Sequence, residues 1–162
     1  MTSKTLEITA EPGKTSFTTR RVVDAPRAIV FDAFTKCEHL TRWMGPRNLT
    51  MAKCTTDLRV GGRYRFVFRG PDGNDVGFSG EYKEIVAPER IVRTFVFEPI
   101  PEAAALETLE LEEHDGRTTI KTTTVHKTVE NRDGHVQSGV DKGMTEGYAR
   151  LDELLAGLLQ PR

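Results

Sequence analysis

The sequence has few of the residues on which many functional classes depend. It contains two cysteines, one tryptophan and four histidines in 162 residues, and its formal net charge is -1. The cysteines, Cys37 and Cys54, show no metal-ligand spacing and no disulfide framework, so we expect two free thiols and a cytoplasmic location. The near-zero net charge indicates no attraction to nucleic acid or to acidic lipid.

Long apolar runs and metal-binding patterns are also absent. No run approaches the roughly 18 residues that a membrane span requires. The start of the chain, residues 1–14, is polar and has no apolar core of a signal peptide. None of the histidines falls in an HxxH or HxxxH pattern; they are His39, His114, His126 and His135. We therefore expect no metal, no cofactor, no nucleic acid and no membrane contact.

The spacing of the apolar residues predicts an α+β fold. Residues 1–14 form a flexible leader, in which Leu6 and Ile8 could add a short strand, and residues 15–160 form a single domain. A strand precedes two short helices, six further strands follow with a period of two, and one long helix ends the chain. The predicted elements are, in order, 15–23, 26–35, 38–44, 49–58, 63–69, 75–86, 90–98, 106–113, 118–127 and 133–158.

The last predicted helix carries an apolar stripe at three- and four-residue steps. We expect it to be continuous and to cross the concave face of a curved antiparallel sheet of six to seven strands. Its buried contacts would be Val140, Met144, Tyr148 and Leu151. A sheet that curves around a single helix need not meet it everywhere, so an incompletely filled interior would form a ligand cavity.

Aromatic residues alternate with arginines in residues 63–69. The arginines, Arg63, Arg65 and Arg69, are then expected on a solvated convex face, and the aromatic side chains on the concave face. There they would either pack as plain core or line a cavity. The concave aromatic set would be Tyr64, Phe66, Phe68, Phe78 and Tyr82.

Polar residues enter the same interior from the last strand. Thr122, Thr124 and His126 share a face with Ile120, and each unbonded polar group would cost about 1–3 kcal/mol. They would bond to one another or to water, or they would orient a ligand. Trp43 ends the second short helix at a Gly-Pro bend, where it would contact the pocket mouth or fill the core.

Catalytic patterns are weak. Ser79 lacks the G-x-S-x-G spacing of a nucleophile elbow, so an enzyme would need a buried titratable group such as His126 or an unforeseen carboxylate. The acidic residues of the predicted strand 106–113 are expected on a solvated sheet edge. They are Glu107, Glu110, Glu112 and Glu113.

Several short motifs, in order and spacing, resemble the START-like SRPBCC superfamily, and within it the family named after the activator of the heat-shock-protein-90 ATPase. They cover roughly residues 15–158. The motifs are Asp24-Ala-Pro26, Trp43-Met-Gly-Pro46, Asp57-Leu-Arg-Val-Gly-Gly-Arg-Tyr-Arg-Phe66, Gly80-Glu-Tyr82, Pro88-Glu-Arg-Ile-Val92 and Gly143-Met-Thr-Glu-Gly-Tyr148.

The resemblance implies a helix-grip fold with a cavity between the sheet and the last helix. Met44 and Met144 stand where many relatives carry tryptophan, and both are expected to face the cavity. The leading hypothesis is binding of a small apolar or aromatic molecule by a monomer or homodimer. The alternatives are a cavity enzyme of cyclase, lyase or hydrolase type, and a chaperone co-factor whose partner is a chaperone or another protein.

Overall fold

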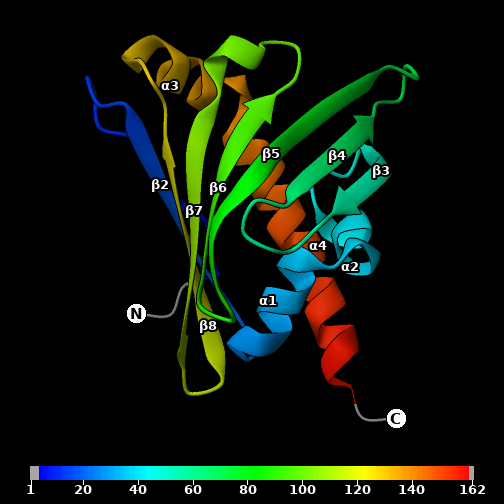
Figure 1. The fold of residues 1–162 in the computed structure, drawn as a ribbon. Helices are drawn as coiled ribbons and strands as arrows, with labels where there is room; N and C mark the ends of the chain where they lie inside the picture. Colours follow the sequence, from blue (N-terminus) through cyan, green and yellow to red (C-terminus); the bar gives the residue numbers. More distant parts are fainter. Residues whose placement is uncertain (1–3, 161–162) are drawn as a thin grey trace.

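The computed structural model describes residues 4–160, in which an antiparallel sheet curves around a C-terminal helix (Figure 1). The sheet has eight strands in the order β1-β2-β8-β7-β6-β5-β4-β3. The strands are β1 (Glu7–Thr9), β2 (Ser16–Val23), β3 (Thr50–Thr56), β4 (Arg63–Arg69), β5 (Asp75–Val86), β6 (Arg90–Phe97), β7 (Ala105–His114) and β8 (Arg117–Val125).

The helices lie between β2 and β3 and at the end of the chain. Helices α1 (Arg27–Thr35) and α2 (Cys37–Trp43) follow β2, and α3 (Val129–His135) and α4 (Asp141–Leu159) follow β8. A short 3-10 turn, η1 (Pro101–Ala103), joins β6 to β7 at the end of the sheet where α3 lies (Figure 1). This arrangement confirms the predicted α+β, helix-grip fold class.

The sheet is larger than the six to seven strands expected because the N-terminal segment contributes to it. Within residues 1–14, Glu7–Thr9 form β1 and pair antiparallel with Thr18–Arg20 of β2. This strand contains Ile8, which is half-buried. Residues 1–3 of the predicted leader lie outside the described residues.

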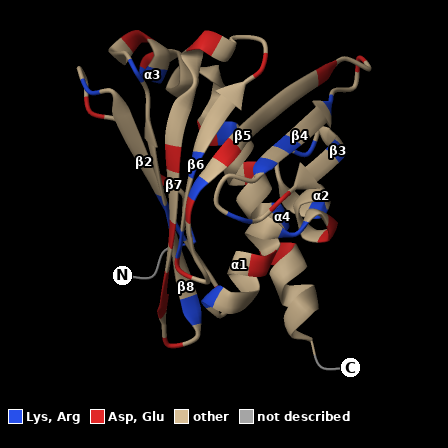
Figure 2. Cartoon of the chain, viewed as in Figure 1, with Lys and Arg blue, Asp and Glu red and all other residues tan. Residues whose placement is uncertain are grey.

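Side-chain alternation determines the two faces of the sheet. In β4, Tyr64, Phe66 and Phe68 are buried on the concave side, while Arg63, Arg65 and Arg69 are exposed. Opposite charges lie close together on the outer surface (Figure 2). The predicted solvated arginine face is confirmed, with ion pairs Arg63–Glu81, Arg65–Glu98 and Arg69–Asp75 at 3.9, 2.8 and 2.8 Å.

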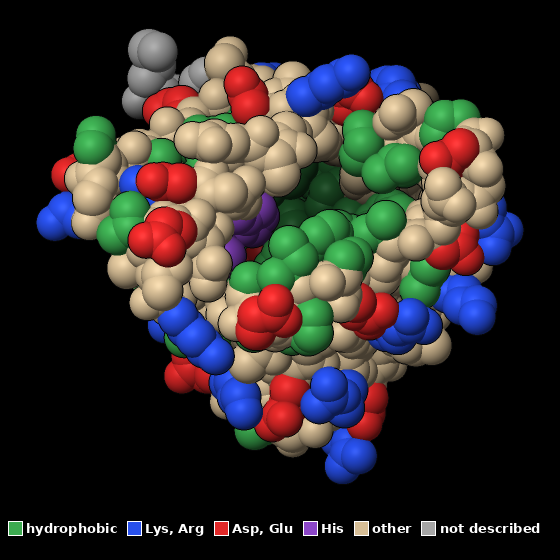
Figure 3. Space-filling view, turned by 90° about the horizontal axis from the view of Figure 1, so that it is seen from above, with side chains coloured by type: hydrophobic (Ala, Val, Ile, Leu, Met, Phe, Trp, Pro, Cys, Tyr) green, Lys and Arg blue, Asp and Glu red, His purple; other side chains and the backbone are tan. Residues whose placement is uncertain are grey.

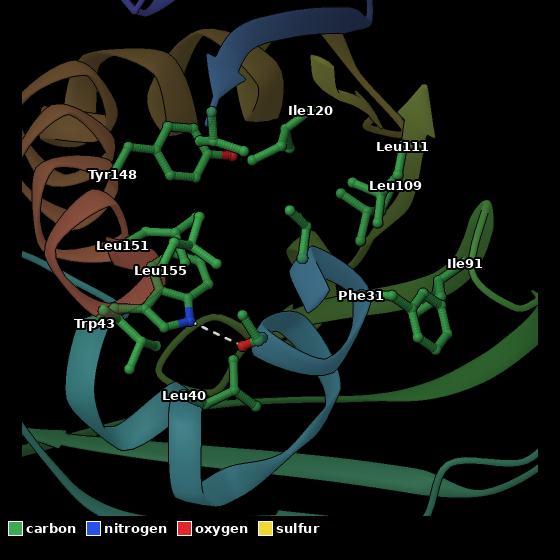
Figure 4. Packing of buried hydrophobic residues seen from close by; sticks show 14 of the residues in the cluster. Phe31, Leu40, Trp43, Ile91, Leu109, Leu111, Ile120, Tyr148, Leu151 and Leu155 are labelled. Carbon is green, nitrogen blue, oxygen red and sulfur yellow. Dashed lines mark hydrogen bonds between the residues drawn. The ribbon is translucent and has the colours of Figure 1, made fainter. Parts of the chain in front are cut away.

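The core fills the end of the sheet that α1, α2 and α4 cover (Figure 4). Trp43 is 3% exposed there, and its indole Nε1 donates a hydrogen bond to the Ala33 carbonyl at 2.8 Å. Since a buried indole N–H needs a partner, this bond lets Trp43 pack as a core residue. Other fully enclosed members are Leu40, Ile120, Leu151 and Leu155.

The expected continuous helix over residues 133–158 is wrong. A π-helical turn, Val136–Val140, separates α3 from α4, and Gly139 within it has φ 99° and ψ 21°. Positive φ interrupts a right-handed helix, and glycine adopts it without a steric penalty. Tyr148 and Leu151 are buried as expected, whereas Val140, which lies in the π-helical turn, and Met144 are only half-buried.

Helix α4 is held to the rest of the molecule at two places. A Cβ on Gly147 would lie 3.3 Å from the Gly45 amide nitrogen, so the absence of a side chain permits close contact with the α2–β3 connection. On the other side, the Arg21 guanidinium of β2 donates to Asp152 at 3.0 and 2.6 Å. These contacts fix α4 against both α2 and the sheet.

The two cysteines form a disulfide, which contradicts the expected pair of free thiols. Cys37 begins α2 and Cys54 lies in β3, and their Cα atoms are 5.8 Å apart. This separation is within the range that a disulfide requires. The cytoplasmic location was expected from free thiols, so the disulfide removes the argument for it.

Among residues 4–160, no helix is both long enough and apolar enough to cross a membrane.

Candidate functional site

A hollow opens at the end of the molecule that carries α3 and η1 (Figure 3). Figure 3 shows hydrophobic side chains along its interior and histidine side chains on one wall. Several inward aromatic residues near this end are half-buried, whereas those at the α1–α2 end are fully enclosed. The interior is therefore packed at one end and open at the other.

Aromatic rings form a connected wall near the opening. Phe95 of β6 stacks on His135 of α3, with ring centroids 5.4 Å apart and planes at 3°. Its other neighbour is Phe78 of β5 at 5.5 Å, and Phe78 in turn contacts Phe97 at 5.4 Å. Phe17 of β2 meets His135 edge-on at 5.0 Å. The wall thus extends from β2 through α3 to β5.

A row of polar residues crosses the concave face one step below this wall. The strand register places Tyr82 opposite Arg93, Arg93 opposite Glu107, and Glu107 opposite Thr124. Arg93 Nε donates to Glu107 Oε1 at 2.8 Å, and the two side chains are 14% and 21% exposed. The next row contains Ile91 and Leu109, which are buried. An ion pair therefore lies between the aromatic wall and the aliphatic core.

The guanidinium group of Arg93 is held on three sides. It lies over the Tyr64 ring at 4.2 Å and near the Phe66 ring at 5.8 Å, a cation-π arrangement. Burial opposes its charge, but the attraction of Glu107 raises the pKa of Arg93 above its usual value. Burial also raises the pKa of Tyr64 and of Tyr148, so both phenols stay neutral.

Two histidines meet where α3 joins the sheet. His126 Nε2 and His135 Nδ1 are 3.0 Å apart, so one ring donates to the other. Burial, and then the neighbouring His126, lower the pKa of His135 to about 4. Burial also lowers the pKa of His126, with a smaller contribution from Arg132. Both rings are neutral near pH 7, and His126 Nδ1 is buried with no hydrogen-bond partner among the described residues.

The predicted aromatic residues divide into two groups. Phe78 and Met144 are half-buried, and Phe78 belongs to the wall of the hollow. The others are at most 6% exposed and pack within the core cluster; they are Trp43, Tyr64, Phe66, Phe68, Tyr82 and Tyr148. Phe68 contacts Phe78 at 5.7 Å, and Tyr64 contacts Arg93, so these two adjoin the hollow from below.

The predicted polar residues of β8 also differ in their partners. Thr122 is satisfied, because its hydroxyl bonds the Thr19 hydroxyl at 2.5 Å. His126 pairs with His135. Thr124 is 3% exposed and its hydroxyl makes no hydrogen bond with any residue that the structure describes. Of the three, Thr124 adjoins the Arg93–Glu107 pair.

Sequence reasoning missed Arg93, Glu107, Phe95 and His135. The expected acidic sheet edge is wrong, because β7 pairs with both β6 and β8 and is not an edge strand. Glu107 is not solvated either, since it shares the concave face of β7 with Ala105 and Leu109. Two-residue alternation could have indicated these charges. Where Ile91 and Leu109 face inward, Arg93 and Glu107, two positions away on the same strands, must also face inward. Of the other predicted edge residues, Glu112 and Glu113 are exposed, and Glu113 Oε1 accepts from the Arg27 amide that begins α1.

A second depression lies on the convex side and has a different character. It has a volume of about 320 Å³ and is lined partly by Lys53, Arg65, Asp75 and Glu98. Arg65 and Glu98 already pair across it. Because half of its lining residues are charged and it lies on the solvated face, it lacks the predominantly apolar walls typical of a small-molecule site.

No three histidine, cysteine, aspartate or glutamate side chains within residues 4–160 gather closely enough to hold a metal ion.

An antiparallel sheet curved around a C-terminal helix, with two short helices after β2 and an internal hollow, defines a helix-grip protein of the START-like SRPBCC class. Residues 24–156 match the model of the family described as "Activator of Hsp90 ATPase homolog 1-like protein", and the chain belongs to that family. No curated protein matches the chain.

Solved structures agree with this assignment. A crystal structure of a Rhodobacter sphaeroides protein is 29% identical, has a TM-score of 0.85, and aligns over 93% of this chain and 99% of that one. A Nitrosomonas europaea protein is 25% identical with a TM-score of 0.80, over 89% and 96% of the two chains. An AHSA1-like protein from Aeromonas hydrophila, 19% identical over 90% and 97%, shares the fold with a TM-score of 0.70.

Proposed function

We propose that the hollow binds a small, mainly apolar or aromatic molecule. Two observations support this: the hollow has a hydrophobic interior (Figure 3), and the half-buried Phe78, Phe95 and Phe97 form a connected set of rings at the same end of the sheet. Apolar walls with a few placed polar groups are the usual composition of a small-molecule site. Here the polar groups are the Arg93–Glu107 pair and Thr124, and the apolar walls come from β5, β6 and α3.

The energy available for binding is modest but sufficient. Removing about 150 Å² of apolar ligand surface from water contributes roughly 4 kcal/mol at 25 cal/mol per Å². Part of this is lost to the immobilisation of the ligand. A bicyclic aromatic molecule is therefore expected to bind no more tightly than about the millimolar range unless polar contacts add to the affinity.

The proposal can be tested with a larger side chain on α4 that fills the hollow. Met144 is half-buried and lies one helical turn before Tyr148, so Met144→Trp directs a larger side chain toward the same space. A neutral dye such as N-phenyl-1-naphthylamine should gain fluorescence with the wild type and lose it with this variant. Leu158→Trp is the matched control, since Leu158 is 40% exposed on the same helix. Equal dye affinity in all three proteins would refute the proposal.

A catalytic role is the second candidate, because a carboxylate and a histidine pair face one interior. Glu107 adjoins the hollow, and its charge opposes the depression of the His135 pKa. Such groups perform general acid–base catalysis when a substrate lies between them. In a screen of aryl esters and hydroxy ketones, turnover that Glu107→Gln abolishes while dye binding persists would favour this candidate.

A co-factor role toward a chaperone is the third candidate, and it comes from the name of the family. Such a role would act through protein contacts on the outer surface of the domain. Stimulation of the ATPase of an Hsp90-class chaperone that is equal in wild type and Met144→Trp would favour it over ligand binding.

A further inference from the structure

The Arg93–Glu107 pair is a polar element inside an otherwise apolar hollow, and its hydrogen-bonding capacity is only partly used. Of the guanidinium nitrogens, Nε alone donates, and it donates to Glu107 Oε1. Neither Nη1 nor Nη2 of Arg93, nor Oε2 of Glu107, hydrogen-bonds to any residue between 4 and 160. These free donors and this free acceptor lie side by side because the two residues are direct neighbours across β6 and β7.

The orientation of the pair is fixed from below. The Tyr64 ring covers one face of the Arg93 guanidinium at 4.2 Å, and the Tyr64 hydroxyl donates to the Thr94 carbonyl at 2.7 Å. The ring is therefore anchored to the strand that carries Arg93. Both charged side chains point inward and still retain 14% and 21% of their surface, so the uncovered part borders the hollow.

The remaining neighbours of the pair are uncharged. Thr124 stands opposite Glu107 and offers a hydroxyl with no partner in the described part of the chain. His126 and His135 are neutral near pH 7, since burial lowers both pKa values. The interior at this level therefore presents one positive and one negative group in contact, with no net charge.

This arrangement discriminates between ligands by charge and by hydrogen bonding. A ligand carboxylate beside Arg93 would also lie beside Glu107, so attraction and repulsion would largely cancel, and the same holds for a cation. A purely apolar ligand would strip water from the free donors and acceptor without replacing it. A neutral group with an acceptor next to a donor would satisfy both.

We infer that the Arg93–Glu107 pair selects neutral aromatic ligands that carry an adjacent acceptor and donor, such as a carboxamide or a hydroxy ketone. The ligand acceptor faces Arg93, the ligand donor faces Glu107 Oε2, and the aromatic part lies against the wall formed by Phe78, Phe95 and His135. This inference rests on the proposed function and names the ligand class of the same site.

The experiment compares four probes with one ring system in displacing N-phenyl-1-naphthylamine: 2-naphthamide, 2-naphthoate, 2-naphthylmethylammonium and 2-ethylnaphthalene. The wild type should bind the amide at least about tenfold more tightly than either charged probe, a difference of about 1.4 kcal/mol. Glu107→Gln leaves Arg93 unopposed and should make naphthoate the tightest probe. Arg93→Gln should favour the ammonium instead.

The controls separate recognition from folding. Glu98→Gln disrupts the equivalent Arg65–Glu98 pair on the convex face and should leave all four affinities unchanged. Where a single variant fails to fold by circular dichroism, Arg93→Met/Glu107→Met replaces both charges with apolar groups, which buried pairs often tolerate. This double variant should weaken the amide about tenfold and bind 2-ethylnaphthalene more tightly than the wild type does, because no polar group then loses water.

The outcomes are distinguishable. If the dye binds but the probe order is the same in wild type and variants, the pair does not recognise the ligand, and the proposed function stands without it. If neither dye nor any probe binds to the wild type, the proposed function fails and the inference fails with it. Reversal of charge preference between Glu107→Gln and Arg93→Gln supports the inference.

Discussion

Gly80 of β5 is the position at which one methyl group should do the most damage. A Cβ there would lie 2.0 Å from the Thr94 carbonyl oxygen and 2.7 Å from Cε2 of Tyr64. Backbone and a buried ring form this contact, so neither side can simply rotate away. The Thr94 carbonyl also accepts the hydrogen bond from the Tyr64 hydroxyl at 2.7 Å. Gly80→Ala should therefore displace both strands and this bond.

The expected loss of stability follows from these two terms. Overpacking a rigid site costs about 1–3 kcal/mol. A buried hydroxyl that loses its partner adds about 1–3 kcal/mol. Gly80→Ala should thus lower the free energy of unfolding by roughly 3–5 kcal/mol, a large part of the 5–15 kcal/mol typical of a domain. Because Tyr64 supports the Arg93 guanidinium, any folded fraction should also bind the amide probe less tightly.

Urea unfolding followed by Trp43 fluorescence measures this loss. Gly143→Ala is the matched control, since a Cβ there would meet nothing closer than 3.8 Å and the residue is helical. It should stabilise the protein by up to about 1 kcal/mol. If the free energy of unfolding of Gly80→Ala is within about 1 kcal/mol of the wild-type value, the close approach of β5 and β6 at this point does not exist.

Three further predictions concern the disulfide, the histidine pair and the helix break. The Cys37–Cys54 bridge closes a 17-residue separation, so Cys37→Ala/Cys54→Ala should lose about 3 kcal/mol, and the unfolded wild type should release no thiol until it is reduced. His135 has a pKa of about 4 against an ordinary 6.5. The unfolded state therefore takes up its proton first, and stability should fall by roughly 2–3 kcal/mol as the pH drops through that window. His135→Gln should flatten this decline and the exposed control His114→Gln should not, whereas equal declines in both would contradict the assignment. Gly139→Ala should cost about 1–2 kcal/mol, because alanine resists the positive φ; Gly134→Ala, with open space around it, should cost nothing in the same urea titration.

Much of the fold could be predicted because β4 largely follows a two-residue alternation. Tyr64, Phe66 and Phe68 are buried where the alternation placed them, and Arg63, Arg65 and Arg69 are exposed, although Val67 on the arginine face is also buried. The break at Gly139 escaped prediction because glycines at 139, 143 and 147 follow the helical spacing. Only the φ of Gly139 differs from that of a helical residue.

The polar part of the site was harder to predict than the aromatic part. A single charge on an inward face is unfavourable by itself, so Glu107 was expected outside, and no local pattern indicated an inward partner such as Arg93. Their pairing depends on the register between β6 and β7, which no local pattern specifies. The disulfide depends in the same way on how α2 lies against β3. The ion pair and the disulfide both depend on contacts between segments far apart in the sequence, and local periodicity does not predict such contacts.

The two C-terminal helices have separate supports, and this has a consequence for the size of the site. Arg132 of α3 donates to the Ser16 and Glu11 carbonyls at 2.9 and 2.8 Å, so α3 is attached to the N-terminal hairpin. Helix α4 packs closely against the α2–β3 connection at Gly147, and its Asp152 accepts hydrogen bonds from Arg21 of β2. The π-helical turn between them therefore acts as an adjustable spacer. Inserting or deleting a residue within 136–140 is therefore expected to shift α3 relative to α4 while Arg132 and Arg21 keep their partners, and so to change the width of the hollow beside α3.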